Sequence, residues 1–126
     1  MADIITAIHH VSFIVADTRR ALAFYCGVLG LTQDFSRPDL GYPGAWLQVG
    51  DGQIHLLELP NPDPVTGRPS HGGRDRHLAM TVTDLSQIKA ALEQANIDFT
   101  LSKSGRCALF CRDIDGNAIE LIESNV

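Results

Sequence analysis

The sequence lacks the features that mark several large classes of protein. Its 126 residues contain no uninterrupted apolar run of the ~20 residues that a membrane-spanning helix needs. The first residues have no basic stretch followed by an apolar core and a cleavage site. These absences predict a cytoplasmic protein with no membrane partner. The formal net charge of −5 provides no excess of positive charge for phosphates, so we also expect no nucleic-acid partner.

Cysteine is scarce, and its positions do not fit a crosslinked or zinc-bound scaffold. Cys26, Cys107 and Cys111 are odd in number and include no Cys-x-x-Cys pair. We therefore expect reduced, buried thiols. With 44% apolar and 20% charged residues, the chain is long enough to form one globular domain without disulfides.

One pattern occurs twice in the chain. The segment HVSFIVAD that starts at His10 and the segment HLAMTVTD that starts at His77 carry His, Val and Asp at the same offsets. Both alternate like strands, with one apolar face and an opposite face that carries the histidine and mostly small side chains. These small side chains leave room for a cavity. The aspartates that end the segments, Asp17 and Asp84, are suited to cap a helix.

Each copy continues with a helix and then with strands. The spacing of apolar residues predicts helices over 18–28 and 85–95. Between the later strand-like runs lie turns that are rich in residues tolerating positive φ. These runs are 44–49, 53–59, 107–112 and 118–122.

Proline marks the boundary between the two copies. Four of the six prolines lie within 60–69, where they prevent a helix or a central strand. We therefore predict an α+β fold in a single domain of residues 1–126. It consists of a first βαβββ module at 1–59, a linker at 60–75 and a second βαβββ module at 76–126. Each module is too small to bury its own sheet face, so the two are expected to be stable only together.

Two histidines and one carboxylate form a candidate metal site. His10 and His77 open the matched strands, and Glu120 lies between apolar neighbours in the last strand, where a charge needs a partner. Without a thiolate set, imidazole nitrogen and carboxylate oxygen are the ligands that divalent Fe, Mn, Ni, Co and Zn prefer. His55 stands in the first half where Glu120 stands in the second, but the preceding turns differ in length and leave its direction open. His9 is interpreted as a strand-end residue that alternates away from His10.

Other polar and aromatic residues near these strands are candidate substrate contacts. Arg74 and Arg76 could hold an acidic group of a substrate, or pair with Asp75 as ordinary surface ions. Arg106 could also meet a substrate carboxylate. Trp46 could line the cavity with an aromatic wall, or pack in the core.

Three segments resemble the vicinal oxygen chelate superfamily: HVSFIVAD from His10, FYCGVLGL from Phe24 and DIDGNAIE from Asp113. This superfamily includes glyoxalase I, methylmalonyl-CoA epimerase, fosfomycin-modifying thiol transferases, extradiol dioxygenases and metal-free bleomycin-resistance binding proteins. The resemblance implies paired βαβββ modules that form a cupped mixed sheet around a cavity for one divalent metal ion. It also implies a homodimer, and leaves open whether the modules pair within one chain or between two.

The resemblance assigns roles to individual residues. His10, His77 and Glu120 match the shared metal ligands, and His55 matches a position where some members carry a fourth ligand or a catalytic base. Bacterial glyoxalase I enzymes usually have a carboxylate there, so His55 could be a ligand, a general base or neither. The leading hypothesis is a metal-dependent lyase or isomerase that acts on a small oxygen-rich substrate through metal-stabilised oxyanion chemistry. An iron-dependent extradiol-type dioxygenase and a non-catalytic drug-binding protein are the alternatives.

Overall fold

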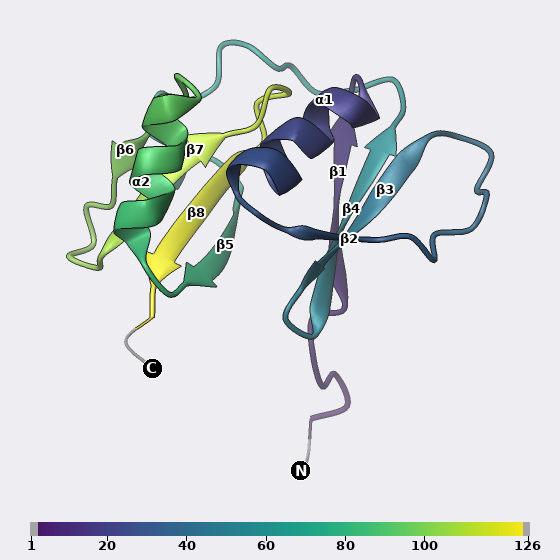
Figure 1. The fold of residues 1–126 in the computed structure, drawn as a ribbon, viewed down its shortest axis with the longest axis horizontal. Helices are drawn as coiled ribbons and strands as arrows, with labels where there is room; N and C mark the ends of the chain where they lie inside the picture. The colour runs from purple at the N-terminus through teal and green to yellow at the C-terminus, as the bar shows by residue number, and fades with distance from the viewer. Residues whose placement is uncertain (1–2, 125–126) are drawn as a thin grey trace.

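The computed structural model describes residues 3–124, which contain two four-stranded sheets with helices packed beside them (Figure 1). The first sheet is formed by β1 (His10–Val15), β2 (Thr32–Asp34), β3 (Gly44–Val49) and β4 (Gly52–Glu58). The second is formed by β5 (His77–Val82), β6 (Thr100–Leu101), β7 (Ala108–Arg112) and β8 (Ala118–Glu123).

The two sheets have the same topology. Their strand orders are β1-β4-β3-β2 and β5-β8-β7-β6. In each sheet the first two neighbours in this order are parallel and the remaining pairs are antiparallel, so both sheets are mixed. The predicted α+β fold of two βαβββ modules is confirmed.

The helices begin at the predicted aspartate caps. The carboxylate of Asp17 accepts a hydrogen bond from the backbone N–H of Arg20, and that of Asp84 from the N–H of Ser86. The helices are α1 (Thr18–Leu22), the π-helix η1 (Ala23–Val28), the short 3-10 helix η2 (Gly72–Arg74) and α2 (Leu85–Gln94). The predicted helix over 18–28 is therefore correct in extent, but its second half is π-helical. Apolar spacing does not distinguish these two hydrogen-bond patterns.

One apolar core joins the two modules. Strand alternation turns one face of each sheet toward the helices, and this face carries the large apolar side chains. Nine large core side chains among residues 3–124, from strands and helices alike, are fully buried: Val15, Tyr25, Leu47, Ile54, Leu56, Leu92, Leu109, Ile119 and Leu121. The core is therefore shared, as expected for modules too small to be stable alone.

The prediction of buried thiols is correct for one cysteine. Cys111 is buried in the core, and burial raises the pKa of its thiol to about 12. Cys26 is half-buried and Cys107 is exposed, so the prediction is wrong for Cys107. Cys107 lies just before β7, outside the strand whose alternation would have turned it inward.

The turn between β7 and β8 joins the second module to the first. The hydroxyl of Tyr25 donates a 2.6 Å hydrogen bond to the buried carboxylate of Asp113, and the N–H of Ala16 donates to Asp115 at 2.9 Å. The turn depends on Gly116, whose φ of 85° is rarely adopted by other residues. The positive φ predicted for this turn is thus confirmed.

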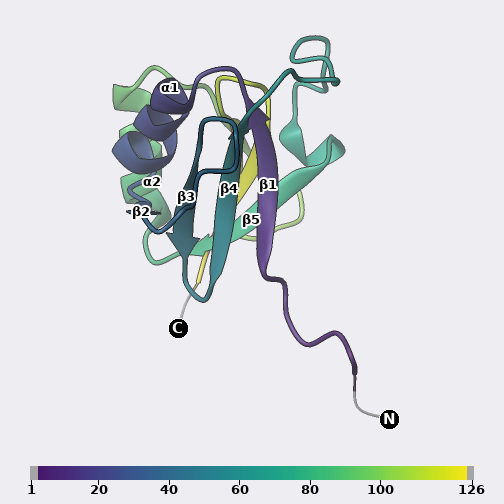
Figure 2. The ribbon, with the colours of Figure 1, turned by 90° about the vertical axis from the view of Figure 1, so that its right-hand side faces the viewer.

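The faces opposite the helices carry the matched histidines, and on the second sheet η2 packs over part of this face, against Phe110 and Ala118. Figure 2 shows β1, β4 and β3 side by side in front, while α1 and α2 lie to one side. His10 and Ser12 on β1 and His77 and Ala79 on β5 are exposed. The two histidines therefore lie on the faces opposite the helices, as the alternation predicts. Within residues 3–124, no helix is long and apolar enough to span a membrane.

Candidate metal centre

The strand registers place His55 and Glu120 at equivalent positions of the two sheets. On one side, each pairs with a residue of the strand that begins with the matched histidine, two positions after that histidine. On the other side, each pairs with an aromatic residue. Directly paired residues point to the same face of a sheet. His55 thus shares the face of His10, which settles the direction that the sequence left open. The two paired sets are Ser12, His55 and Trp46 in the first sheet, and Ala79, Glu120 and Phe110 in the second.

In the second sheet, His77 and Glu120 approach each other. Nε2 of His77 lies 3.2 Å from Oε1 of Glu120, and Nδ1 donates a hydrogen bond to the backbone carbonyl of Asp75 at 2.9 Å. A carbonyl only accepts, so Nδ1 carries a proton. In a neutral imidazole, Nε2 then carries a lone pair, and this lone pair faces a carboxylate oxygen. The contact is favourable only if the ring gains a second proton or a cation binds both atoms.

Glu120 is buried although one of its oxygens has no hydrogen-bond partner. Its exposed fraction is 2%, and Oε2 accepts no hydrogen bond within the described part of the chain. Arg106 approaches this oxygen only to 3.5 Å, from a side chain that is 59% exposed. Burying an unpaired carboxylate oxygen is costly. The pair of a lone-pair imidazole nitrogen and a buried carboxylate therefore fits a divalent cation.

In the first sheet, His10 and His55 stack on each other. Their ring centroids are 3.9 Å apart, and the other face of His55 lies on Trp46 at 4.6 Å. Trp46 therefore lies on the face that carries His10. The pKa of His55 is lowered, first by burial and then by the charges of His10 and His9. A neutral imidazole is the form that binds a metal ion.

His9 does not turn away from His10, and this prediction is wrong. The two Nδ1 atoms are 2.8 Å apart and share a hydrogen bond. β1 begins at His10, so His9 precedes the strand and its side chain is not bound by strand alternation.

The two pairs of candidate ligands lie in different sheets. Among residues 3–124, no three His, Cys, Asp or Glu side chains converge on one possible metal position. A single chain thus presents two half-sites, His10 with His55 and His77 with Glu120, and does not bring all four together. That these four residues hold one ion stays a prediction.

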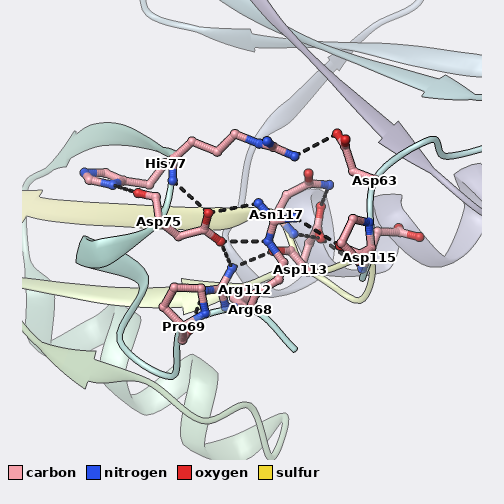
Figure 3. Close-up of polar contacts among 12 residues, drawn as sticks. Asp63, Arg68, Pro69, Asp75, His77, Arg112, Asp113, Asp115 and Asn117 are labelled. Atoms are coloured by element: carbon pink, nitrogen blue, oxygen red, sulfur yellow. Dashed lines mark hydrogen bonds and ion pairs between the residues drawn. The ribbon is translucent and has the colours of Figure 1, made fainter. Parts of the chain in front are cut away.

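Asp75 fixes the start of β5 beside His77 (Figure 3). Its carboxylate accepts hydrogen bonds from Arg68 Nε at 2.7 Å and from Arg112 at 2.8 Å. The interpretation in which the side chain of Arg76 pairs with Asp75 is wrong, because that side chain binds Asp63 at 2.7 Å, while the backbone N–H of Arg76 donates to Asp75 at 2.9 Å. Arg68 and Arg112, which hold the carboxylate of Asp75, lie 7 and 37 residues away along the chain, and the carbonyl of Asp75 in turn orients the ring of His77.

We expect Asp75→Asn to destabilise the protein near neutral pH and much less in acid. The hydrogen bond from Arg68, followed by that from Arg112, holds the pKa of Asp75 well below its usual value of 3.8. The resulting stabilisation is complete above this usual value and is lost as the pH falls through the lower pKa of the folded state. Urea denaturation should show a loss of about 1–3 kcal/mol near pH 7, shrinking below about pH 3.

The matched control is Asp63→Asn, which removes an ion pair whose side chains are 68% and 52% exposed. Exposed pairs contribute little, so its free energy of unfolding should change by less than about 1 kcal/mol. An equal loss for Asp75→Asn at both pH values would contradict the assignment of the effect to its charge.

Two polar residues not singled out from the sequence extend the first half-site. Oε1 of Gln53 is 2.8 Å from Nε2 of His55, and Nε2 of Gln53 is 2.8 Å from Oδ2 of Asp34. Gln53 lies two residues before His55, so strand alternation could have placed it on the same face. No local pattern links Asp34, which comes from β2, to this site.

The two modules and their strand orders define the vicinal oxygen chelate fold. The chain belongs to the Glyoxalase/Bleomycin resistance protein/Dioxygenase superfamily, whose family model matches residues 7–121. It is 29% identical to Glyoxylase I 4 of Arabidopsis thaliana over 122 residues, covering 93% of this chain and 70% of that protein. It is 30% identical to the uncharacterized protein YaeR of Escherichia coli (strain K12) over 129 residues, covering 92% and 95%.

A solved structure described as a glyoxalase family protein from Bacillus anthracis has the same fold. Its TM-score is 0.80 at 23% identity, and the match covers 99% of this chain and 100% of that one. The resemblance seen in the three sequence segments is thus confirmed, for the superfamily by the family model and for the fold by this structure.

Proposed function

We propose that the protein is a divalent-metal-dependent lyase or isomerase that acts on a small oxygen-rich molecule. The observation that carries this proposal is the contact of His77 with Glu120, in which an imidazole lone pair faces a buried carboxylate whose second oxygen accepts no hydrogen bond among residues 3–124. A divalent ion of Fe, Mn, Ni, Co or Zn would relieve both features. The name of the Arabidopsis relative, Glyoxylase I 4, favours this chemistry over the alternatives.

The remaining ligands are proposed to come from a second copy of the chain. His10 and His77 are exposed in one chain, and the half-sites lie in separate sheets. In a swapped homodimer, His10 and His55 of one copy would meet His77 and Glu120 of the other, producing two equivalent sites. This arrangement would also cover the exposed starts of β1 and β5.

When bound, the metal ion would act as a Lewis acid that stabilises negative charge on substrate oxygens. The chain itself would supply the surroundings of that charge. Trp46 and Phe110 occupy equivalent places beside His55 and Glu120, and their rings would exclude water from the site. The lowered pKa of His55 leaves its ring neutral near neutral pH, able to bind metal or to accept a proton.

Elemental analysis of the wild-type protein beside His77→Ala tests the proposal. We expect about one ion per chain after metal loading and dialysis, as for two sites in a symmetric dimer, and loss of this ion in the variant. His71→Ala is the control, because His71 packs on Phe110 and bonds Thr100 but faces no carboxylate of the site. It should retain the metal. A wild-type protein that binds no metal after loading would contradict the proposal.

A second candidate function is the binding of a planar drug without catalysis. The stacked rings of Trp46, His55 and His10 form a platform whose outermost ring is exposed. Quenching of the single tryptophan by bleomycin in the metal-free protein, without turnover by the metal-loaded one, would favour this function. Oxygen uptake with catechols after ferrous loading would instead favour the dioxygenase.

A further inference from the structure

We propose that Asp34, acting through Gln53, fixes the tautomer of His55, so that Nδ1 is the atom this ring offers to a metal ion or a proton. Asp34 and Gln53 are therefore positioning residues. The role of Nδ1 rests on the proposed function, whereas the tautomer itself does not.

The direction of each hydrogen bond follows from groups that can act in only one way. The amide nitrogen of Gln48 donates to the backbone carbonyls of Gly50 at 2.8 Å and Gly52 at 3.2 Å, which leaves its oxygen to accept. One amide atom of Gln53 lies 3.0 Å from this oxygen and 2.8 Å from the carboxylate of Asp34. An atom between two acceptors must be the donor, so it is the Gln53 nitrogen.

The oxygen of the Gln53 amide is then an acceptor directed at His55. It lies 2.8 Å from Nε2, which must carry the proton, and the neutral ring keeps its lone pair on Nδ1. His10 and Trp46 cover the two faces of the ring. Rotation of the ring is therefore restricted, and the position of Nδ1 is set by the network.

Asp34 is itself held in place at the end of this network. The backbone N–H of Ser36 donates to Oδ1 at 2.9 Å, while Oδ2 accepts from Gln53. These hydrogen bonds, that of Ser36 first, hold the pKa of Asp34 below its usual range. The carboxylate can only accept, and this gives the network its direction.

The two modules thus orient their histidines by different means. His77 donates from Nδ1 to the backbone of Asp75 and is left with a lone pair on Nε2. His55 donates from Nε2 to a side chain and is left with a lone pair on Nδ1. A hydrogen bond to the second ring nitrogen is the usual way in which proteins orient a metal-binding histidine.

Histidine ¹⁵N NMR of the metal-free protein tests the tautomer directly. Near pH 8, where histidine is neutral, the signal assigned to His55 by its loss in His55→Gln should show the proton on Nε2. In Asp34→Asn, the Asn oxygen would still accept the hydrogen bond from the N–H of Ser36. The Asn amide nitrogen would then face the Gln53 nitrogen, so that two donors would meet. We expect the Nε2–H population to fall and Zn²⁺ to bind roughly 10-fold more weakly, or worse.

Asp39→Asn is the matched control, since Asp39 accepts a hydrogen bond from the N–H of Gly41 in the connection that follows β2. It should change neither the tautomer nor the Zn²⁺ affinity, and an unchanged His71 signal in each variant reports an intact fold. A proton on Nδ1 of wild-type His55, or an Asp34→Asn variant with unchanged tautomer and affinity, would overturn the inference. A wild-type protein that binds no Zn²⁺ would instead contradict the proposed function, because the tautomer is read without metal.

Discussion

Replacing Glu120 by glutamine is expected to abolish metal binding without destabilising the metal-free protein. The carboxylate is 2% exposed, and its Oε2 has no hydrogen-bond partner within residues 3–124. Glutamine has nearly the same shape but no charge to bury, and its amide can donate to the lone pair of His77. We therefore expect the free energy of unfolding of the metal-free variant to equal that of wild type or exceed it by about 1 kcal/mol.

In the presence of metal, the order of stability should be reversed, with wild type more stable than Glu120→Gln. Glutamine provides a neutral and weaker ligand, so affinity should fall by more than the roughly 10- to 100-fold typical of residues that only support a ligand. A ligand stabilises only the folded state that binds it. Zn²⁺ should therefore raise the melting temperature of wild type and leave the melting temperature of Glu120→Gln unchanged.

Glu93→Gln is the control, because Glu93 is exposed near the end of α2. Its melting temperature should rise with Zn²⁺ as in wild type. A Glu120→Gln variant that is strongly destabilised without metal would show that the carboxylate has a structural role. Stabilisation of that variant by Zn²⁺ would place the ion elsewhere.

Much of the fold could be predicted because its signals are local. The repeated strand pattern at His10 and His77, the caps at Asp17 and Asp84 and the helix lengths depend on neighbouring residues alone. Two strands were not located from the sequence. β2 has three residues and β6 has two, and such short segments do not show a recognisable alternation.

The candidate site was predictable only in part, because several of its contacts depend on register or distance. The face of His55 could not be decided from turn length, whereas its pairing with Ser12 decides it. Asp75 contacts Arg112, 37 residues away, through an arrangement of strands that no sequence pattern reports. Sequence patterns therefore identify residue types for a metal site, whereas tertiary structure selects the residues that orient them.

The sequence also left open whether one chain or two complete the site, and a mixture of two defective variants is expected to answer this. His10→Ala removes a ligand from the first module, and Glu120→Gln removes one from the second. In a swapped heterodimer, the first module of the Glu120→Gln chain meets the second module of the His10→Ala chain, so one of the two sites has all four ligands. If the modules pair within each chain, every site lacks a ligand.

Random reassortment gives heterodimers in half of all pairs, each with one intact site, so the mixture should bind about a quarter of the wild-type metal. The variants would be mixed, dissociated in mild denaturant and returned to buffer, and metal per chain would be counted in the dimer fraction from gel filtration. A mixture of His77→Ala with Glu120→Gln is the matched control, because both changes lie in the same module and no pairing restores a site. Equal metal in the two mixtures would refute the shared site, whereas recovery only in the first would establish that two chains share each metal site.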